Sequence, residues 1–160
     1  MTLRTTPPFR ADHVGSFLRP QYLLEARDRF FNQKSITAEQ LRAVEDKAIA
    51  EIIKFQADVG LQSITDGEFR RTYFHIDFLE QLGGVITEAG QLSIQNADGT
   101  VSLAPPVIKV VDKVRHVKDI QRADFEYLKS QVAAGLTPKV TIPSPTMLHF
   151  RGGRAGISRE

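Results

Sequence analysis

The sequence predicts an α/β fold made of βα-type units, and three observations lead to this class. A helical pattern of about 22 residues runs directly into a short apolar strand segment at 61–65. Other strand-like segments occur at 11–14, 107–111 and 139–143, and segments with helical periodicity lie between the strand-like segments. Four such units amount to half of an eight-stranded barrel. We expect residues 1–160 to form one partial barrel domain.

The composition is that of a soluble globular protein. The chain has 160 residues, of which 41% are apolar and 25% charged. Its 21 basic and 19 acidic residues give a net charge of +2, with no basic block and no aromatic ladder for nucleic acid. No segment approaches the roughly 18 apolar residues of a membrane span. Residues 1–8 lack the apolar core of a secretory signal. We expect a cytoplasmic protein with neither nucleic-acid nor membrane partners.

The segment Ala11–Val14 is the expected first strand, and Gly15 and Ser16 form a tight turn at its carboxyl end. Glycine allows the backbone to approach a ligand closely, while Ser16 offers a hydroxyl and an N–H group. His13 has two interpretations from its position. It is either a pocket residue at the strand end or a packed histidine bonded to the backbone.

Two helices are expected before residue 60. The first begins near Pro20 and ends near Asn32. The second begins at a capping box made by Thr37 and Gln40 and stops at Gly60. Because a helix then separates two strands, these strands should lie parallel. The predicted core face of the second helix consists of Leu41, Val44, Ala48, Ile52, Phe55 and Val59.

Charged side chains concentrate around one glycine directly after the strand at 61–65. Strand ends lead into loops that carry polar groups at binding sites, although a solvated turn with a surface ion pair is the alternative. In a βαβ unit this turn opens at the same sheet edge as the turn at Gly15 and Ser16, so we expect a shared pocket. The charged residues of the turn are Asp66, Glu68, Arg70 and Arg71.

The sequence after residue 71 predicts two further helices and a small inserted β segment, here called the β excursion. Residues 72–82 form a short helix, stopped by two glycines, that carries His75; this histidine either faces the pocket or is exposed. Alternating residues with turn signals predict one or two hairpins at about 85–105. The segment 107–111 is either the third main strand or part of this excursion. A helix from Asp119 or Arg122 then precedes the fourth main strand, 139–143.

Two polar segments follow the fourth predicted strand. Ser144 and Thr146 occupy its carboxyl end, where their hydroxyl groups either meet a ligand or belong to a turn that prolines make rigid. The segment 151–156 is glycine-rich and basic, which would suit an anion. It lacks the strand-to-helix context of a phosphate-binding loop.

Three segments resemble, in order, motifs of the cobalamin-independent methionine synthase family, also called 5-methyltetrahydropteroyltriglutamate–homocysteine methyltransferase-like. They are HVGSFLRP at 13–20, DGEFRR at 66–71 and KVTIPSPT at 139–146. The likeness is to the short, single-barrel members. It implies the first half of a (β/α)8 TIM-type barrel, and a role in methionine biosynthesis by zinc-dependent methyl transfer to the thiol of homocysteine. A folate is the implied methyl donor.

The resemblance also implies roles for particular residues. The turn of Val14, Gly15 and Ser16 holds the amino-acid part of homocysteine, and Glu68 binds its ammonium group. A zwitterionic amino acid needs donors for its carboxylate and a carboxylate for its ammonium group, which agrees with these residue types. Asp66, in the same turn as Glu68, is a further candidate for substrate binding. Further candidates are Ser144 and Thr146 on the folate side and His13, Arg70 and His75 as possible pocket residues.

The absence of cysteine separates this chain from a complete family member. It excludes disulfides, a thiolate nucleophile and Cys-ligated zinc within the chain. The family activates its thiol on zinc held by His, Glu and two Cys from the later half of the barrel. We therefore expect no metal ligands here and no methyl transfer by the isolated chain.

Three explanations are open for a chain that resembles only half a barrel. It is a fragment or short gene product, a short protein that pairs with another chain, or a relative that has lost catalysis. A half barrel leaves strand edges and apolar helix faces uncovered, so we expect a homo-oligomer or a complementing second half. The alternative function is therefore an inactive binding or assembly module that completes a barrel with another chain.

Overall fold

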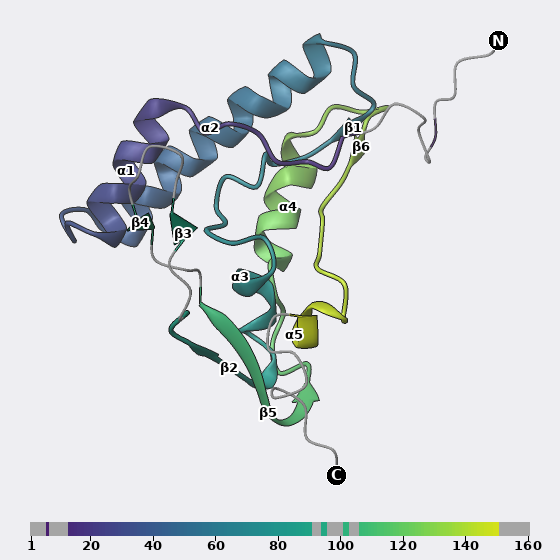
Figure 1. Ribbon diagram of the computed structural model, residues 1–160. Coiled ribbons are helices and arrows are strands. Elements are labelled where there is room, and N and C mark those ends of the chain that lie inside the picture. The colour runs from purple at the N-terminus through teal and green to yellow at the C-terminus, as the bar shows by residue number, and fades with distance from the viewer. Residues whose placement is uncertain (1–5, 7–12, 91–93, 96–100, 103–105, 151–160) are drawn as a thin grey trace. The chain divides into compact units, whose positions relative to one another are not determined.

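The computed structural model describes residues 6, 13–90, 94–95, 101–102 and 106–150 of the chain (Figure 1). It is a mixed α/β structure, as the sequence predicts. Its internal contacts define two units. The first comprises residues 1–70 and 122–141, and the second comprises residues 71–121 and 142–160. The expectation of one partial barrel domain stays a prediction.

The described part of the first unit contains three helices and a pair of short strands. Its helices are α1 (Gln21–Phe31), α2 (Ala38–Asp58) and α4 (Arg122–Gln131). The predicted capping box starts α2, since Gln40 N donates to Thr37 Oγ1 at 3.3 Å and Thr37 N donates to Gln40 Oε1 at 2.8 Å. These helix boundaries follow the sequence prediction closely, because caps and helical periodicity are local signals.

The strands β1 (Ser63–Ile64) and β6 (Thr137–Pro138) form a parallel pair, side by side in Figure 1. The fourth main strand was expected at 139–143, so it lies earlier than predicted. The partner strand β1 is only two residues long, so the ladder ends after Pro138, with Lys139 N donating to Ile64 O at 2.8 Å. The predicted first strand is not found where the structure describes it: residues 13–14 are not in a strand, and 11–12 lie outside the described residues.

The predicted core face of α2 is confirmed in part. Leu41 and Ala48 are buried and Val44 and Ile52 pack against the core, but Phe55 and Val59 are 53% and 57% exposed. Glu45 and Gln56 are instead buried. Both side chains have polar partners that offset the free-energy cost of burial. A prediction of the core face from apolar residues alone does not take such partners into account. The buried cluster comprises Leu23, Ala48, Ile49, Ile53, Ile64, Phe69 and Leu128.

The second unit is built on an antiparallel strand pair. The strands β2 (Gly83–Glu88) and β5 (Val107–Arg115) pair antiparallel, so 107–111 belongs to the β excursion and is not a third main strand. The pairing register shifts between Gly83 and Val85. Gly84 has φ +80°, and a Cβ there would lie 2.6 Å from the carbonyl oxygen of Asp112. The irregularity therefore requires glycine.

A second hairpin and two short helices complete the described part of this unit. The strands β3 (Ile94–Gln95) and β4 (Val101–Ser102) pair antiparallel, which confirms a hairpin within the excursion. The helix α5 spans Met147–Phe150. The glycine-rich segment 151–156 lies outside the described residues.

The helix expected over 72–82 is shorter in the structure. The helix α3 spans only Ile76–Leu79, and the two glycines expected to stop it begin β2. Asp77 accounts for the late start, because its carboxylate accepts bonds from Thr72 N at 2.6 Å and Tyr73 N at 2.9 Å. Among the described residues, no helix is long and apolar enough to cross a membrane.

Candidate functional site

Two turns that are far apart in the sequence lie against each other in the first unit. The hydroxyl of Thr65 donates to Gly15 O at 2.7 Å, and Phe17 N donates to Gly67 O at 3.1 Å. The turn at Gly15 and Ser16, here called the serine turn, therefore adjoins the turn of residues 66–68, here called the glutamate turn. The adjacency expected from the sequence is confirmed. Ser16 itself is exposed.

A buried glutamine fixes the base of both turns. Gln56 on α2 is fully buried and bonds the backbone of Thr65 in both directions. Its Nε2 donates to Thr65 O at 2.8 Å, and its Oε1 accepts from Thr65 N at 2.9 Å. Because Thr65 leads into the glutamate turn, this pair ties the turn to the helix behind it.

The backbone of the glutamate turn is left-handed at two successive residues. Gly67 has φ +69° and Glu68 has φ +58°. A side chain is uncommon in this conformation, so surrounding contacts must hold Glu68 there. One such contact is local: Asp66 Oδ1 accepts from Glu68 N at 3.0 Å. Asp66 is buried, so it acts in the structure as a support of the turn.

The carboxylate of Glu68 is oriented from the segment after β6. Thr141 Oγ1 donates to Glu68 Oε1 at 2.6 Å. Glu68 is half-buried, and Val14 beside the serine turn is 78% exposed. The serine turn and an oriented carboxylate are thus parts of one polar surface in this unit.

His13 is a packed histidine in the structure. Its Nε2 donates to Ser63 O at 3.1 Å, and its ring meets Phe17 edge-on with 5.2 Å between centroids. The ammonium group of Lys139 donates to the carbonyl oxygen of His13. These contacts favour the second of the two interpretations from sequence, in which His13 supports the serine turn.

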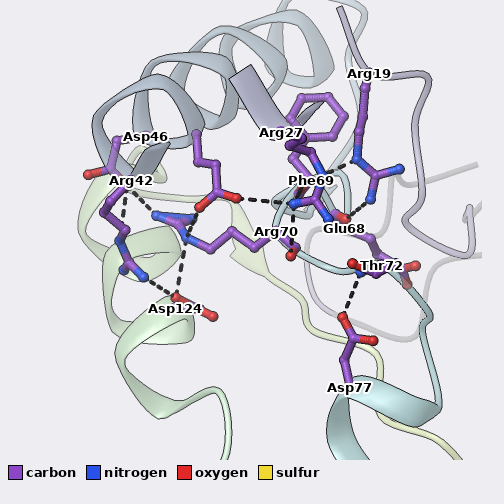
Figure 2. Close-up of polar contacts among 11 residues, drawn as sticks. Arg19, Arg27, Arg42, Asp46, Glu68, Phe69, Arg70, Thr72, Asp77 and Asp124 are labelled. Carbon is purple, nitrogen blue, oxygen red and sulfur yellow. Dashed lines mark hydrogen bonds and ion pairs between the residues drawn. The ribbon is translucent and has the colours of Figure 1, made fainter. Parts of the chain in front are cut away.

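Arg70 belongs to an ionic network and not to the polar surface of the two turns. Its guanidinium pairs with Asp46, with Asp124 at 3.3 Å and with Glu45 at 3.7 Å (Figure 2). Only 8% of its side chain is exposed. Burial raises the pKa of Glu45, and the positive charges of Arg70 and other arginines act in the opposite direction. These contacts give Arg70 a structural role, and its suggested place in a pocket stays a prediction.

The remaining candidate residues lie in the second unit. His75 is 5% exposed and its ring lies 4.6 Å from that of Phe74, so the interpretation as an exposed helical histidine is wrong. Ser144 Oγ and Thr146 Oγ1 form a 2.9 Å hydrogen bond just before α5. Both of these residues are exposed. Their part in a site stays a prediction.

The amino-acid sequence of this chain matches a known protein family. A family model described as cobalamin-independent synthase, catalytic domain, matches residues 9–149. The chain belongs to the cobalamin-independent methionine synthase family.

Three relatives of this methionine synthase family illustrate the likeness. The uncharacterized protein YxjG of Bacillus subtilis is 43% identical over 152 residues, which are 93% of this chain and 38% of the relative. A 5-methyltetrahydropteroyltriglutamate–homocysteine methyltransferase of Thermosynechococcus vestitus is 30% identical, over 98% of this chain and 20% of the relative. A crystal structure from Listeria monocytogenes, named as a candidate vitamin-B12-independent methionine synthase, has a TM-score of 0.71 and 40% identity, over 90% of this chain and 39% of that one. The chain thus spans less than two fifths of each.

The residues present do not fit the zinc centre that the resemblance implies for the whole family enzyme. That centre needs two cysteines, and the sequence contains none. Among the described residues, no group of three or more His, Asp or Glu side chains is placed to hold a metal ion. We assign no zinc ligand to this chain and derive no step through zinc.

Several residues that shape this surface were missed from the sequence. Thr65 and Gln56 were treated as parts of a strand and a helix, although a glutamine at a core position of an amphipathic helix was an available signal. Thr141 lies inside a family-like segment but was not singled out. Arg19 also lies inside a family-like segment without being singled out, and the carbonyl groups that Arg19 and Arg27 bind in and after the glutamate turn lie more than 40 residues away.

Proposed function

We propose that this chain supplies the thiol-substrate half of an S-methyltransferase of the methionine synthase type. The observation that carries the proposal is the contact between the serine turn and the glutamate turn. It brings a flexible glycine, a hydroxyl and a carboxylate together on one surface, which is the donor and acceptor set that an α-amino acid requires. The family membership supplies the reaction class.

In this proposal the amino acid is homocysteine or a similar thiol. Backbone N–H groups at Gly15 and Ser16, with the hydroxyl of Ser16, receive its carboxylate, and Val14 borders the same turn. Glu68 receives its ammonium group through a charge-assisted hydrogen bond. Thr141 keeps the Glu68 carboxylate in one orientation by its 2.6 Å bond. The contribution of this half is to position the thiol for in-line attack on a methyl group.

The same proposal includes the first half of a (β/α)8 barrel. The parallel pairing of β1 with β6 supports it, because barrel strands are parallel. The likeness to the Listeria monocytogenes structure over 90% of this chain supports it as well. Completion of the barrel by another chain, or by a second copy, is part of the proposal.

The methyl donor is proposed to be a folate, by analogy with the names of curated relatives. Ser144 and Thr146 are the residues proposed to face it. Zinc is proposed to be held by the remainder of the complete enzyme, and the isolated chain is proposed to lack methyltransferase activity.

Calorimetric titration of the full 160-residue chain with homocysteine, under reducing conditions, tests the substrate-binding proposal. Wild type should bind, and Glu68→Gln should weaken the affinity roughly tenfold or more, since the amide oxygen still accepts a hydrogen bond but the negative charge opposite the ammonium group is lost. Glu25→Gln on the exposed face of α1 is the matched control and should bind as wild type does. Equal affinities of wild type and Glu68→Gln would contradict the proposed role of Glu68.

A further inference from the structure

Two arginines from the region of α1 converge on the backbone of the glutamate turn. Arg19 donates to Glu68 O at 2.8 Å and to Phe69 O at 3.2 Å. Arg27 donates to Phe69 O at 3.3 Å and to Arg70 O at 3.1 Å. Three successive carbonyl groups are therefore held by two guanidinium groups that share the middle one, as Figure 2 shows.

These contacts lie at the point where the backbone conformation is costly. Glu68 is left-handed with φ +58°, although it has a side chain. Such a conformation persists only where neighbouring groups determine it. A guanidinium has a rigid, planar set of donors, so it constrains the direction of the carbonyl groups that it binds more than a freely rotating ammonium group does.

We infer that Arg19 and Arg27 are positioning residues that hold Glu68 in its left-handed conformation and so aim its carboxylate at the ammonium group of the substrate. The identity of the substrate in this inference rests on the proposed function. The effect of the two arginines on the backbone of Glu68 does not depend on it. Neither arginine touches the substrate in this account. Their bonds to main-chain carbonyl groups act on Glu68 from the side of the turn that faces α1.

Arg27 has a second role, and the experiment must separate it from the effect of Arg27 on the glutamate turn. It also pairs with the buried carboxylate of Glu45 at 3.2 Å. Removing its charge would leave that carboxylate with one fewer partner in a buried position, which is destabilising by itself. Arg27→Lys keeps a positive charge there while losing the two-carbonyl geometry. Arg19→Ala and Arg19→Lys are the principal variants.

Arg42 provides a matched control in the same unit. It pairs with Asp124 at 2.7 Å and with Asp46 at 3.6 Å, two of the carboxylates that also pair with Arg70. Arg42→Ala therefore removes a guanidinium from the ionic network without removing either of the two that hold the turn. It should change stability but not the selectivity measured below.

The first measurement compares two ligands on each variant of the full chain by calorimetry. Homocysteine has an ammonium group, and 4-mercaptobutyrate is the same molecule without it. In wild type homocysteine should bind roughly tenfold or more tightly, because only it pairs with Glu68. In Arg19→Ala the ratio of the two dissociation constants should fall close to one, with an intermediate ratio in Arg19→Lys and Arg27→Lys. A merely structural role would weaken both ligands equally and leave the ratio unchanged.

The second measurement needs no ligand. A left-handed residue gives a strong intraresidue NOE between its amide proton and its Hα, because positive φ brings these two protons close together. Glu68 should show this NOE in wild type and in Arg42→Ala, and should lose much of it in Arg19→Ala. If the alanine variant does not fold, Arg19→Lys is used in its place for both measurements.

The outcomes separate the two proposals. Loss of the NOE together with loss of the ligand ratio supports the inference. A retained NOE, or a lost NOE with the ratio intact, overturns it. If wild type binds neither ligand, the proposed function fails, and the NOE alone then decides whether the arginines hold Glu68.

Discussion

The hydroxyl of Thr65 donates a 2.7 Å hydrogen bond to the carbonyl oxygen of Gly15, which lies 50 residues earlier in the chain. The same oxygen atom of Thr65 accepts a bond from Gly67 N at 3.2 Å. One side chain that is 2% exposed thus joins the serine turn to the glutamate turn. The buried hydroxyl group of Thr65 and the backbone bond from Phe17 N to Gly67 O are thus two direct links between the turns.

Replacing Thr65 by valine tests the first of these links. Valine has nearly the same shape but leaves the buried Gly15 O and Gly67 N without that partner, so the free energy of unfolding should fall by about 1–3 kcal/mol. Thr65→Ser keeps the hydroxyl and should cost only the lost methyl group, about 1 kcal/mol. Urea unfolding measures both. A valine variant as stable as the serine variant would show that the hydroxyl contributes little.

Gly15→Ala should destabilise the chain for two reasons. Gly15 has φ +132°, and an added Cβ would lie 2.9 Å from Thr65 Cγ2. Backbone strain of this kind costs about 1–3 kcal/mol, and the steric contact adds to it. Thermal unfolding gives the loss.

Gly60→Ala separates strain from contact, because Gly60 has φ +85° with nothing within 4 Å of the added Cβ. It should cost less than Gly15→Ala. The double variant Gly15→Ala with Thr65→Ser removes Cγ2 and should recover part of the loss relative to Thr65→Ser alone. An equal cost of Gly15→Ala in both backgrounds would rule out the contact with Cγ2 as a cause.

Gln56→Leu should be among the most destabilising single changes on α2. It leaves the buried N–H and C=O groups of Thr65 without their side-chain partner, at about 1–3 kcal/mol for each group. Gln131→Leu, at the exposed end of α4, is the control for the change of residue type. Denaturant midpoints of the two variants give the comparison, and similar midpoints would mean that water replaces the lost partner.

Tyr22 should ionise at unusually high pH. Burial, and then the hydrogen bond and the charge of Glu51, raise its pKa from 10.0 to about 12. The unfolded chain releases this proton near pH 10 while the folded chain keeps it. The contribution of Tyr22 to stability is therefore complete below pH 10 and is lost as the pH rises from 10 to about 12.

The ultraviolet absorbance of tyrosinate measures this ionisation. The difference between wild type and Tyr22→Phe isolates Tyr22 from the other tyrosines. Glu51→Gln removes the neighbouring charge and should lower the pKa of Tyr22, whose hydroxyl donates to Glu51 at 2.6 Å. An unchanged titration in Glu51→Gln would leave burial as the whole cause.

The chain should associate in solution at micromolar concentration. Phe55 and Val59 are more than half exposed on α2, and β1 pairs with β6 in a two-stranded sheet. Exposed apolar side chains and open strand edges promote association. Light scattering should give a mass above 17.9 kDa for wild type and a lower mass for Phe55→Glu. A monodisperse species of 17.9 kDa for wild type would contradict this prediction.

Local patterns were sufficient for part of the fold. The ends of α2 could be placed because Thr37, Gln40 and Gly60 act through neighbours within a few residues. The buried face of the same helix was predicted only in part, because Gln56 and Glu45 are buried with Thr65, Arg27 and Arg70 as their partners. The segment at 107–111 could not be assigned to one sheet for a similar reason. Its apolar alternation suits any sheet, and pairing with β2 decides which one it joins.

The sequence by itself determined the helices α1, α2 and α4, the two turns as candidate binding elements and the family to which the chain belongs. Each of these depends on residues that are close together in the chain or on short motifs in a fixed order. The tertiary structure decided that Arg70 belongs to an ionic network and that Thr65 joins the turns. It also decided that Glu68 has a left-handed backbone conformation next to carbonyl groups that two arginines bind. These features are hydrogen bonds and ion pairs between groups tens of residues apart, and folding alone brings such groups together.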